Sequence, residues 1–318
     1  MSVLTLSDIQ CAADRIRPYV HRTPVLTCTA LNQMCGAELF FKCENLQKVG
    51  AFKIRGATNA VLSLRPEDLS KGVVTHSSGN HAAALALAAR WRQTKAYVVM
   101  PENSPGVKRR AVAGYGAEII LCAPTLEARE STQAEVIART GAVPVHPYND
   151  QRVVAGQGTA ALELCGDVPD LDGVVAPVGG GGLLSGTALA VAGVSPRTRV
   201  FGAEPELADD AFRSMQTGQI QPPRPPLTVA DGLRTALCEL TFTILRRHAA
   251  GIVTVSEDEI IAAMRHIWER MKLVVEPSGA VPLAALLFHR DAFPGQRFGL
   301  ILSGGNVDLD HLPWKGQQ

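Results

Sequence analysis

The chain has 318 residues, of which 46% are hydrophobic and 19% charged, as in a globular protein and unlike a disordered one. This length suits two domains. Lys and Arg number 31 and Asp and Glu 30, so the formal charge is +1. Because basic residues do not outnumber acidic ones enough to attract a phosphate backbone, we expect no nucleic-acid partner.

Membrane and export signals are also missing from the sequence. The best apolar run, residues 279–288, is too short for a membrane span. The first ten residues, MSVLTLSDIQ, have no basic start followed by an apolar stretch, so no secretory signal is expected. These observations predict a cytoplasmic protein that does not enter a membrane.

The cysteines indicate a protein with reduced thiols. They are Cys11, Cys28, Cys35, Cys43, Cys122, Cys165 and Cys238. Seven is an odd number and no Cys-x-x-Cys occurs, so neither a disulfide framework nor a structural zinc site is expected. We expect reduced thiols that pack as small hydrophobic side chains.

Helix and strand signals alternate along the chain. Ser7 and Gln10 form a capping box that predicts a helix to about residue 17, and Ser256 and Glu259 form a second one before a predicted helix over 260–271. Other helices are predicted over 79–92, over 126–139 and from residue 183. Strands are predicted over 38–43, 72–76, 96–100, 117–121, 173–178, 200–203, 252–255 and 298–302.

This alternation predicts an α/β protein with parallel sheets that carry helices on both faces. Residues 72–149 have a strand–helix alternation of their own. We therefore expect a small domain over 72–149, inserted into a large domain formed by 1–71 and 150–318. The proline-rich stretch 221–226 reads as an irregular surface loop, too short to be a domain linker.

Four glycines follow a predicted strand and precede a helix: Gly179, Gly180, Gly181 and Gly182. Glycines let a backbone approach an anion closely, and a helix N-terminus offers free N–H groups. The spacing matches neither GxGxxG nor GxxxxGK[ST], so neither nucleotide motif is present. From the residues alone, a tight turn and a phosphate site are equally good interpretations.

Lys53 lies between Phe52 and Ile54, with a glycine on each side of this segment. Desolvation in such surroundings would lower its pKa and make it a nucleophile toward a carbonyl. The alternative is a lysine at a helix start whose ammonium group reaches solvent. This segment alone favours the alternative.

The segment Ser77-Ser78-Gly79-Asn80-His81 lies between a predicted strand and a helix. The ends of strands in an open α/β sheet are where ligands bind. Ser and Asn could hydrogen-bond a carboxylate there, or the segment could be an ordinary helix cap.

Two further candidate sites, one with a serine and one with three acidic residues, stand near strand ends. Ser303 follows the last strand and could bond a ring nitrogen, although two glycines after a strand usually indicate a turn. Glu204, Asp209 and Asp210 could hold Mg²⁺ or Ca²⁺, or form a solvated acidic loop. The sequence has no GxSxG, SxxK or HExxH motif, so the hydrolases that use them are not indicated.

Each of these motifs is a moderate signal alone, but their order along the chain resembles that of a known family. In chain order they are GAFKIRGA (50–57), SSGNH (77–81), AGQGT (155–159), VGGGG (178–182), AEP with a following acidic pair (203–210), ERMKLVVEPSG (269–279) and LSGGN (302–306). Over about residues 9–310 the chain resembles the fold-type II pyridoxal-phosphate (PLP) enzymes of the serine/threonine dehydratase group. Within that group it most resembles serine racemases and hydroxyaspartate dehydratases. The resemblance implies a tryptophan synthase β-like fold, with the cofactor between two open parallel-sheet domains.

The resemblance also implies roles at the cofactor. Lys53 would hold PLP as a Schiff base, with Phe52 against the ring, Asn80 at the ring hydroxyl and Ser303 at the pyridine nitrogen. The phosphate would be bound by Gly179, Gly180, Gly181, Gly182 and Leu183. Tyr148 departs from the family, because it replaces an Asn that helps to position PLP.

For the substrate and a metal, the resemblance implies two more groups of residues. The substrate carboxylate side would be held by Ser77, Asn80, His81 and Arg129. Ser78 would stand opposite Lys53 as a second acid/base. Glu204, the Ala208 carbonyl and Asp210 would bind a divalent cation, namely Mg²⁺, Ca²⁺ or Mn²⁺.

The activity implied by the resemblance is dehydration and deamination of a small β-hydroxy amino acid to a 2-oxo acid and ammonia. L-serine, L-threonine and 3-hydroxyaspartate are the candidate substrates, and a homodimer is expected. One alternative is an amino-acid racemase with a side dehydratase activity, in which Ser78 is essential. A more distant alternative is a non-catalytic ligand-binding protein on the same fold.

Overall fold

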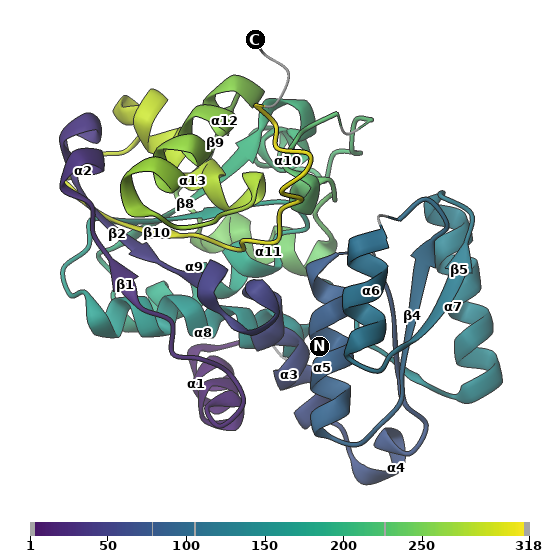
Figure 1. Cartoon of the computed structure of the whole chain (residues 1–318). Coiled ribbons are helices and arrows are strands. Elements are labelled where there is room, and N and C mark those ends of the chain that lie inside the picture. Colours follow the sequence, from purple (N-terminus) through teal and green to yellow (C-terminus); the bar gives the residue numbers. More distant parts are fainter. Residues whose placement is uncertain (1–3, 78, 105, 226, 315–318) are drawn as a thin grey trace.

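The computed structural model describes residues 4–77, 79–104, 106–225 and 227–314. Two sheets with helices on both faces form two units that lie side by side (Figure 1). The larger sheet has the strand order β1-β2-β10-β7-β8-β9, and the smaller one β5-β4-β3-β6. The predicted α/β class is confirmed.

The larger sheet is parallel except at one edge. Its strands are β1 (Val25–Leu26), β2 (Glu38–Lys42), β10 (Arg297–Ile301), β7 (Gly173–Pro177), β8 (Arg199–Pro205) and β9 (Gly251–Val255). β1 pairs with β2 antiparallel, which corrects the expectation of purely parallel sheets. The central strand β7 is buried along its whole length. Its continuous apolar run is typical of a strand that is covered on both faces.

Two hydrophobic clusters cover the two faces of this sheet. One face carries α2 (Thr29–Cys35), α12 (Glu257–His266) and α13 (Pro277–Phe288). The other face carries α1 (Leu6–Ile16), α8 (Gln151–Asp167), α9 (Gly182–Val194), α10 (Asp210–Thr217) and α11 (Glu239–His248).

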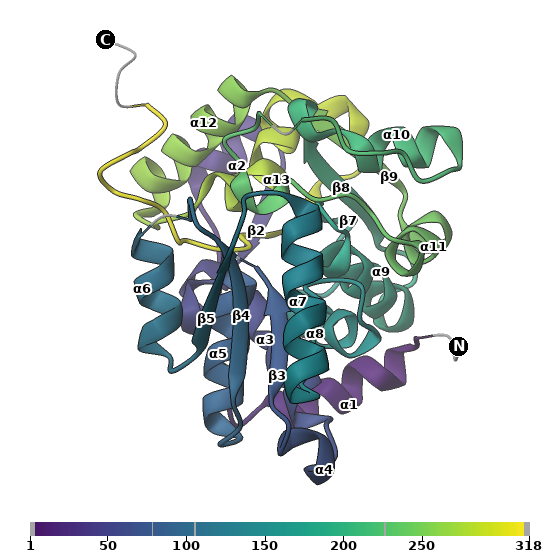
Figure 2. The ribbon, with the colours of Figure 1, turned by 90° about the vertical axis from the view of Figure 1, so that its right-hand side faces the viewer.

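The smaller sheet consists of β5 (Glu118–Cys122), β4 (Ala96–Pro101), β3 (Val73–His76) and β6 (Val143–Pro144), all parallel. Helices α5 (Asn80–Trp91) and α6 (Gly106–Gly114) lie on one side of it, and α7 (Leu126–Thr140) lies on the other (Figure 2). We propose that this unit is a domain of residues 72–149, because all four of its strands lie within that range.

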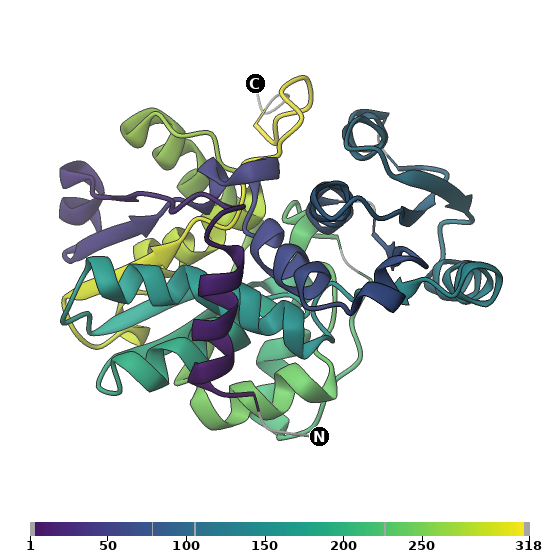
Figure 3. The ribbon, with the colours of Figure 1, turned by 90° about the horizontal axis from the view of Figure 1, so that it is seen from below.

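Helix α3 (Lys53–Leu62) joins the two units. It contacts α8 of the larger unit and α5 of the smaller one, and the view from below shows the units on either side of it (Figure 3). The short α4 (Pro66–Leu69) then leads into β3. The short helical turns are η1 (Glu44–Leu46), η2 (Lys48–Gly50), η3 (Glu206–Ala208), η4 (Asp231–Leu233), η5 (Ile267–Met271) and η6 (Arg290–Ala292).

Several predicted boundaries need correction. The first helix is capped by Thr5, whose capping box with Asp8 replaces the one predicted from Ser7 and Gln10. The second capping box, Ser256 with Glu259, is confirmed. The helix predicted over 260–271 is helical throughout, but its last part, 267–271, is the π-helical turn η5 and not α-helix.

All seven cysteines are free, as predicted. Only Cys35, Cys43 and Cys122 are buried, so the expectation that all pack in the core is wrong. Burial raises the pKa of the Cys35 and Cys43 thiols to about 12, which makes both unreactive at neutral pH. In the described part of the chain, no helix is both long and apolar enough to cross a bilayer.

Candidate active site

Lys53 is the first residue of α3, and the end of β10 fixes its position. Ala51 forms an isolated antiparallel bridge with Gly304, and the Phe52 N–H donates to the Ser303 carbonyl at 3.0 Å. Residues separated by 250 positions in the sequence therefore lie side by side. The structure thus brings Phe52, Lys53 and Ser303 together, as the resemblance implied.

The half-buried Lys53 side chain places its amine between a backbone carbonyl and an aromatic ring. Its Nζ donates to the Pro147 carbonyl at 3.2 Å and stands 5.1 Å from the centre of the Phe52 ring. Burial lowers the pKa of Lys53 to about 8, against the opposing effect of the Glu276 carboxylate. More of the amine is neutral at physiological pH than in an exposed lysine, which suits a nucleophile or a base.

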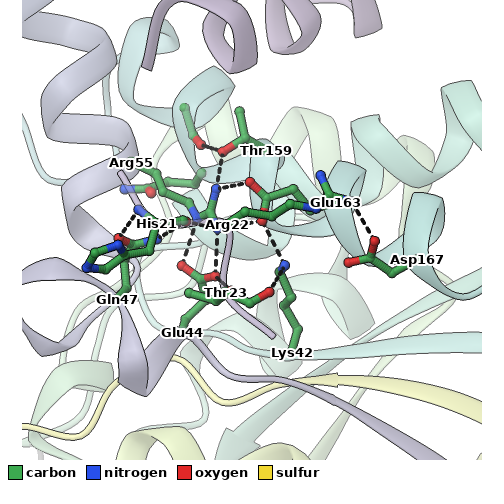
Figure 4. A network of polar contacts seen from close by, with 12 residues as sticks. His21, Arg22, Thr23, Lys42, Glu44, Gln47, Arg55, Thr159, Glu163 and Asp167 are labelled. Atoms are coloured by element: carbon green, nitrogen blue, oxygen red, sulfur yellow. Dashed lines mark hydrogen bonds and ion pairs between the residues drawn. The ribbon is translucent and has the colours of Figure 1, made fainter. Parts of the chain in front are cut away.

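A buried ionic network fixes the first turn of α3 (Figure 4). The Arg55 guanidinium donates to both oxygens of Glu44, at 2.7 and 2.8 Å, and to both oxygens of Glu163, at 2.8 Å each. The Lys42 ammonium pairs with Glu163 at 2.7 Å. Two positive and two negative charges thus balance inside the protein, and they tie α3 to the segment after β2 and to α8. Because Arg55 follows Lys53 by two residues, the network holds the catalytic candidate in place.

Three histidines lie near Lys53: His81 and His146 interact with its charge, and His76 packs against His146. Burial, the largest cause, and the Lys53 charge lower the pKa of His81 to about 3. Burial, His76 and Lys53 together lower the pKa of His146 to about 4, and the pKa of His76 is also lowered, chiefly by burial. His146 packs edge-on against His76, with 5.8 Å between the ring centres. All three imidazoles are therefore neutral at pH 7 and act through hydrogen bonds rather than charge.

The tautomers of two of these rings follow from their partners. His81 Nε2 lies 3.0 Å from the Val145 carbonyl, so it carries the proton. Its Nδ1 is then an acceptor, buried and without a partner among the described residues. His146 Nδ1 accepts from the backbone N–H groups of Tyr148 and Asn149, at 3.3 and 2.8 Å.

The four-glycine loop needs glycine for space and for conformation. A Cβ on Gly180 would lie 2.3 Å from the Tyr148 ring, and one on Gly182 would lie 2.9 Å from the Tyr148 Cβ. Gly181 has φ +82°, and the Gly180 N–H donates to Thr235 Oγ1 at 2.8 Å. Helix α9 begins here, at Gly182. Close backbone approach and free N–H groups at a helix start fit a phosphate group such as that of PLP.

Asn80 and Glu276 form a second polar network beside the end of β10. The Asn80 Nδ2 donates to the Glu276 oxygens at 2.9 and 3.2 Å, and the Asn306 Nδ2 donates to the Asn80 Oδ1 at 2.9 Å. Glu276 and Asn306 were not predicted as site residues. Glu276 lies in the EPSG motif directly before a helix, and this was the one available signal in the sequence.

The remaining predicted substrate residues lie at the end of β3 and beyond. The Ser77 N–H donates to the Val99 carbonyl at 3.1 Å, which places Ser77 at the strand end. Ser78 lies outside the described residues. Arg129 on α7 donates to the Thr125 carbonyl and acts electrostatically on His76. In the described part of the chain, Arg129 makes no hydrogen bond to Ser77, Asn80 or His81, so the structure does not join it to them directly.

The predicted cation ligands lie at the end of β8 and the start of α10. The Glu204 oxygens accept the N–H groups of Ala211 and Phe212, at 3.0 and 2.7 Å. Burial and the nearby Asp210 raise the pKa of Glu204, and burial raises the pKa of Asp210 to about 6. The Asp210 Oδ2 is buried without a partner among the described residues, and Ala208 is buried beside them. Two buried carboxylates and an orphaned oxygen fit a bound cation.

A cavity of about 700 Å³ is lined by residues of both units. Asn80, Asn306, Lys108 and Asp231 are among its lining residues. Lys108 on α6 forms an ion pair with Asp231 in η4, so the pair links the two units across the cavity.

Comparison with known proteins shows which family the chain resembles. Residues 16–304 match the family "Pyridoxal-phosphate dependent enzyme". The chain is 52% identical over 314 residues to the β-hydroxyaspartate dehydratase of Paracoccus denitrificans, covering 99% of this chain and 100% of that protein. It is 47% identical over 310 residues to the L-threo-3-hydroxyaspartate ammonia-lyase of Saccharomyces cerevisiae, covering 97% and 95%.

A solved structure shows the same fold. The serine racemase of Dictyostelium discoideum superposes with a TM-score of 0.93 at 51% identity, covering 97% of this chain and 100% of that one. The tryptophan synthase β-like, fold-type II architecture expected from the sequence is thereby confirmed. This likeness and the full-length match place the chain in the family of pyridoxal-phosphate dependent enzymes.

Proposed function

We propose that the protein is a PLP-dependent dehydratase and ammonia-lyase, which converts a small β-hydroxy amino acid to a 2-oxo acid and ammonia. The observation that carries this proposal is the Lys53 amine, whose pKa is lowered and whose helix start is held by the backbone at the end of β10. The relatives named for 3-hydroxyaspartate dehydration and deamination support it. 3-Hydroxyaspartate, L-serine and L-threonine are the candidate substrates.

The residues of the site fit PLP as follows. When bound, PLP supplies an electron sink for the bond broken at the substrate Cα. The N–H groups of Gly179, Gly181, Gly182 and Leu183 would hold its phosphate, whereas the Gly180 N–H would first have to leave Thr235. The Asn80 amide would donate to the ring oxygen, and the Ser303 hydroxyl would meet the ring nitrogen.

Lys53 has two duties in this scheme. It would attach the cofactor through Nζ, and once displaced by the substrate amine, Nζ would take the proton from the substrate Cα. Ser77 and the backbone N–H groups of Asn80 and His81, in the first turn of α5, would hold the substrate carboxylate, with Arg129 further out. Loss of water across Cα and Cβ, followed by replacement of the amine with water, gives the 2-oxo acid and ammonia. The three neutral imidazoles add polar groups without competing charges.

A second candidate is an amino-acid racemase. Ser78 stands in the SSGNH segment that begins where β3 ends, and a relative named serine racemase is 51% identical over 316 residues. If Ser78 returns the proton on the face opposite Lys53, the product is the other enantiomer. The same protein could then both racemise and dehydrate.

A divalent cation at Glu204, the Ala208 carbonyl and Asp210 is part of the proposal. Among the described residues, no three His, Cys, Asp or Glu side chains group around a common point. The two carboxylates would therefore share the ion with backbone oxygens and water, which are ligands that Mg²⁺, Ca²⁺ and Mn²⁺ accept. A homodimer and a cytoplasmic location are also proposed, on the resemblance alone, and light scattering tests the dimer.

One experiment tests the proposed activity and its rival together. PLP-loaded protein is incubated with each L- and D-enantiomer of the candidate amino acids, and 2-oxo acid, ammonia and enantiomer ratio are measured. We expect equal amounts of 2-oxo acid and ammonia from at least one L-substrate. Ser78→Ala should abolish racemisation and retain part of the dehydration. A loaded protein that releases neither 2-oxo acid nor the other enantiomer would contradict the proposal.

A further inference from the structure

The Glu276 carboxylate is buried where two distant segments meet. Its side chain is 4% exposed, and its backbone N–H donates to the Gly304 carbonyl at 3.0 Å. Glu276 stands directly before α13, while Asn80 begins α5 of the other unit. A buried carboxylate needs hydrogen-bond donors, and the chain supplies them from both sides.

The hydrogen bonds around this carboxylate form a closed ring of three residues, Asn80, Glu276 and Asn306. The Asn80 Nδ2 donates to both Glu276 oxygens, at 2.9 and 3.2 Å, and the Asn306 backbone N–H donates to Oε2 at 3.2 Å. The Asn306 Nδ2 donates to the Asn80 Oδ1 at 2.9 Å and to the Val49 carbonyl at 2.7 Å.

This ring fixes which way the Asn80 amide points. In the reverse orientation, the Asn80 oxygen would face a carboxylate and its NH₂ group would face the NH₂ group of Asn306. Both contacts are repulsive, so the observed orientation is the one the network allows. One N–H of the Asn80 amide can satisfy Glu276, and the second N–H remains free to donate.

We propose that Glu276 is a positioning residue, whose carboxylate orients the Asn80 amide so that its free N–H donates to the ring oxygen of bound PLP. This inference rests on the proposed function and adds a residue that acts on the cofactor through another side chain. An Asn80 held in this way presents a donor, not an acceptor, to an oxygen that carries negative charge.

The charges that face Glu276 come from three elements. Lys53 lies on α3, Lys108 on α6 and Asp231 in η4. Burial and Asp231 raise the pKa of Glu276 to about 7, while Asn80, Lys108 and Asn306 oppose the rise. Glu276 in turn raises the pKa of Lys53. A proton gained by Glu276 below neutral pH would weaken its acceptance from Asn80, and the orientation of the amide would loosen.

The experiment compares the absorption spectrum of bound PLP, as a function of pH, and the Kd for PLP in four proteins. These are wild type, Glu276→Gln, Glu276→Asp and the control Glu259→Gln. Glu259 is a partly buried carboxylate that accepts from the Ser256 N–H in a capping box away from the site. We expect a spectral transition near pH 7 in wild type and in the control. Glu276→Gln should lose the transition and bind PLP roughly tenfold more weakly, as for one lost hydrogen bond to a charged group.

A second comparison tests whether Glu276 acts through Asn80. In an Asn80→Ala background, Glu276→Gln should change neither the spectrum nor the Kd further. An equal effect in both backgrounds would contradict the inference, as would a folded Glu276→Gln with the wild-type spectrum and Kd at every pH. If Glu276→Gln does not fold by circular dichroism, Glu276→Asp decides: it should bind PLP more weakly than wild type, and an unchanged Kd would contradict the inference. Failure of wild type to bind PLP would instead contradict the proposed function.

Discussion

At the scale of single residues, the site depends on basic side chains whose burial disfavours their protonated form. Burial lowers the pKa of Lys53, and it also lowers the pKa of the three histidines near it. The sequence showed the composition around Lys53 but favoured an exposed side chain. It could not show Pro147 and His146, because these neighbours come from 94 or so positions further along the chain.

The lowered pKa of Lys53 has a consequence for stability in protein stripped of PLP. The amine binds its proton with a pKa of about 8 when folded and near 10.5 when unfolded. Between these values the unfolded chain binds more protons, so the Lys53 contribution to folding stability rises with pH over this window. Measured by urea unfolding from pH 7 to 10.5, wild type should gain stability relative to Lys53→Met as pH rises. A constant difference between the two proteins would show that Lys53 titrates as an exposed lysine.

The glycine loop predicts a steric effect at one residue. Gly180→Ala places a methyl group 2.3 Å from the Tyr148 ring, so the loop must shift. The N–H groups that would bind the phosphate shift with it, and PLP should bind at least roughly tenfold more weakly, about 1.4 kcal/mol. The matched control is Gly166→Ala in α8, whose added Cβ meets nothing within 4 Å. Equilibrium dialysis against PLP should leave the control unchanged, and equal Kd values for both variants would contradict the phosphate assignment.

At the scale of elements, the joints between helices and strands carry the site. Helix α3 begins at Lys53 and is held by β10 on one side and by the Arg55 network on the other. The sequence predicted most strands to within one or two residues, because their β-branched runs are short and bounded. It did not predict α3, whose buried residues include Arg55, Thr58 and Asn59, which are side chains that a sequence pattern assigns to an exposed face.

The Arg55 network predicts a large energetic effect. Arg55→Met leaves the buried Glu44 without its main partner, so we expect the free energy of unfolding to fall by about 3–5 kcal/mol. Arg17→Met removes an exposed pair with Asp14 and should cost less than about 1 kcal/mol. Urea unfolding at pH 7 measures both. A similar small loss in the two variants would show that the buried network does not hold α3.

Glu204 and Asp210, where β8 meets α10, predict that a divalent cation stabilises the folded protein. An ion that binds only the folded state stabilises by mass action, roughly 2.7 kcal/mol at a hundredfold excess over its Kd. EDTA should therefore lower the melting temperature of wild type, and Mg²⁺, Ca²⁺ or Mn²⁺ should restore it. Asp210→Ala should show neither response. An unchanged wild-type melting temperature in EDTA would mean that these carboxylates hold no ion.

At the scale of the whole molecule, the site lies where two parallel-sheet units meet. The alternation of strands and helices predicted the α/β class, and the family resemblance implied a site between two sheets; the family match confirms the fold. The contacts across the joint could not be predicted from spacing: Asn80 and Glu276 are 196 positions apart, and Lys108 and Asp231 are 123 apart. Such pairs depend on how the two units pack, which local propensity does not encode. The motif order could identify Lys53, whereas the partners that tune it needed the structure.

The central claim is that Lys53 is the residue to which PLP attaches. The direct measurement is borohydride reduction of the PLP-loaded protein, followed by proteolysis and mass spectrometry of the labelled peptide. The account predicts a yellow protein before reduction and one cofactor adduct, on Lys53, with no adduct in Lys53→Met. A cofactor adduct on another lysine, or a protein that takes up no PLP, would contradict it.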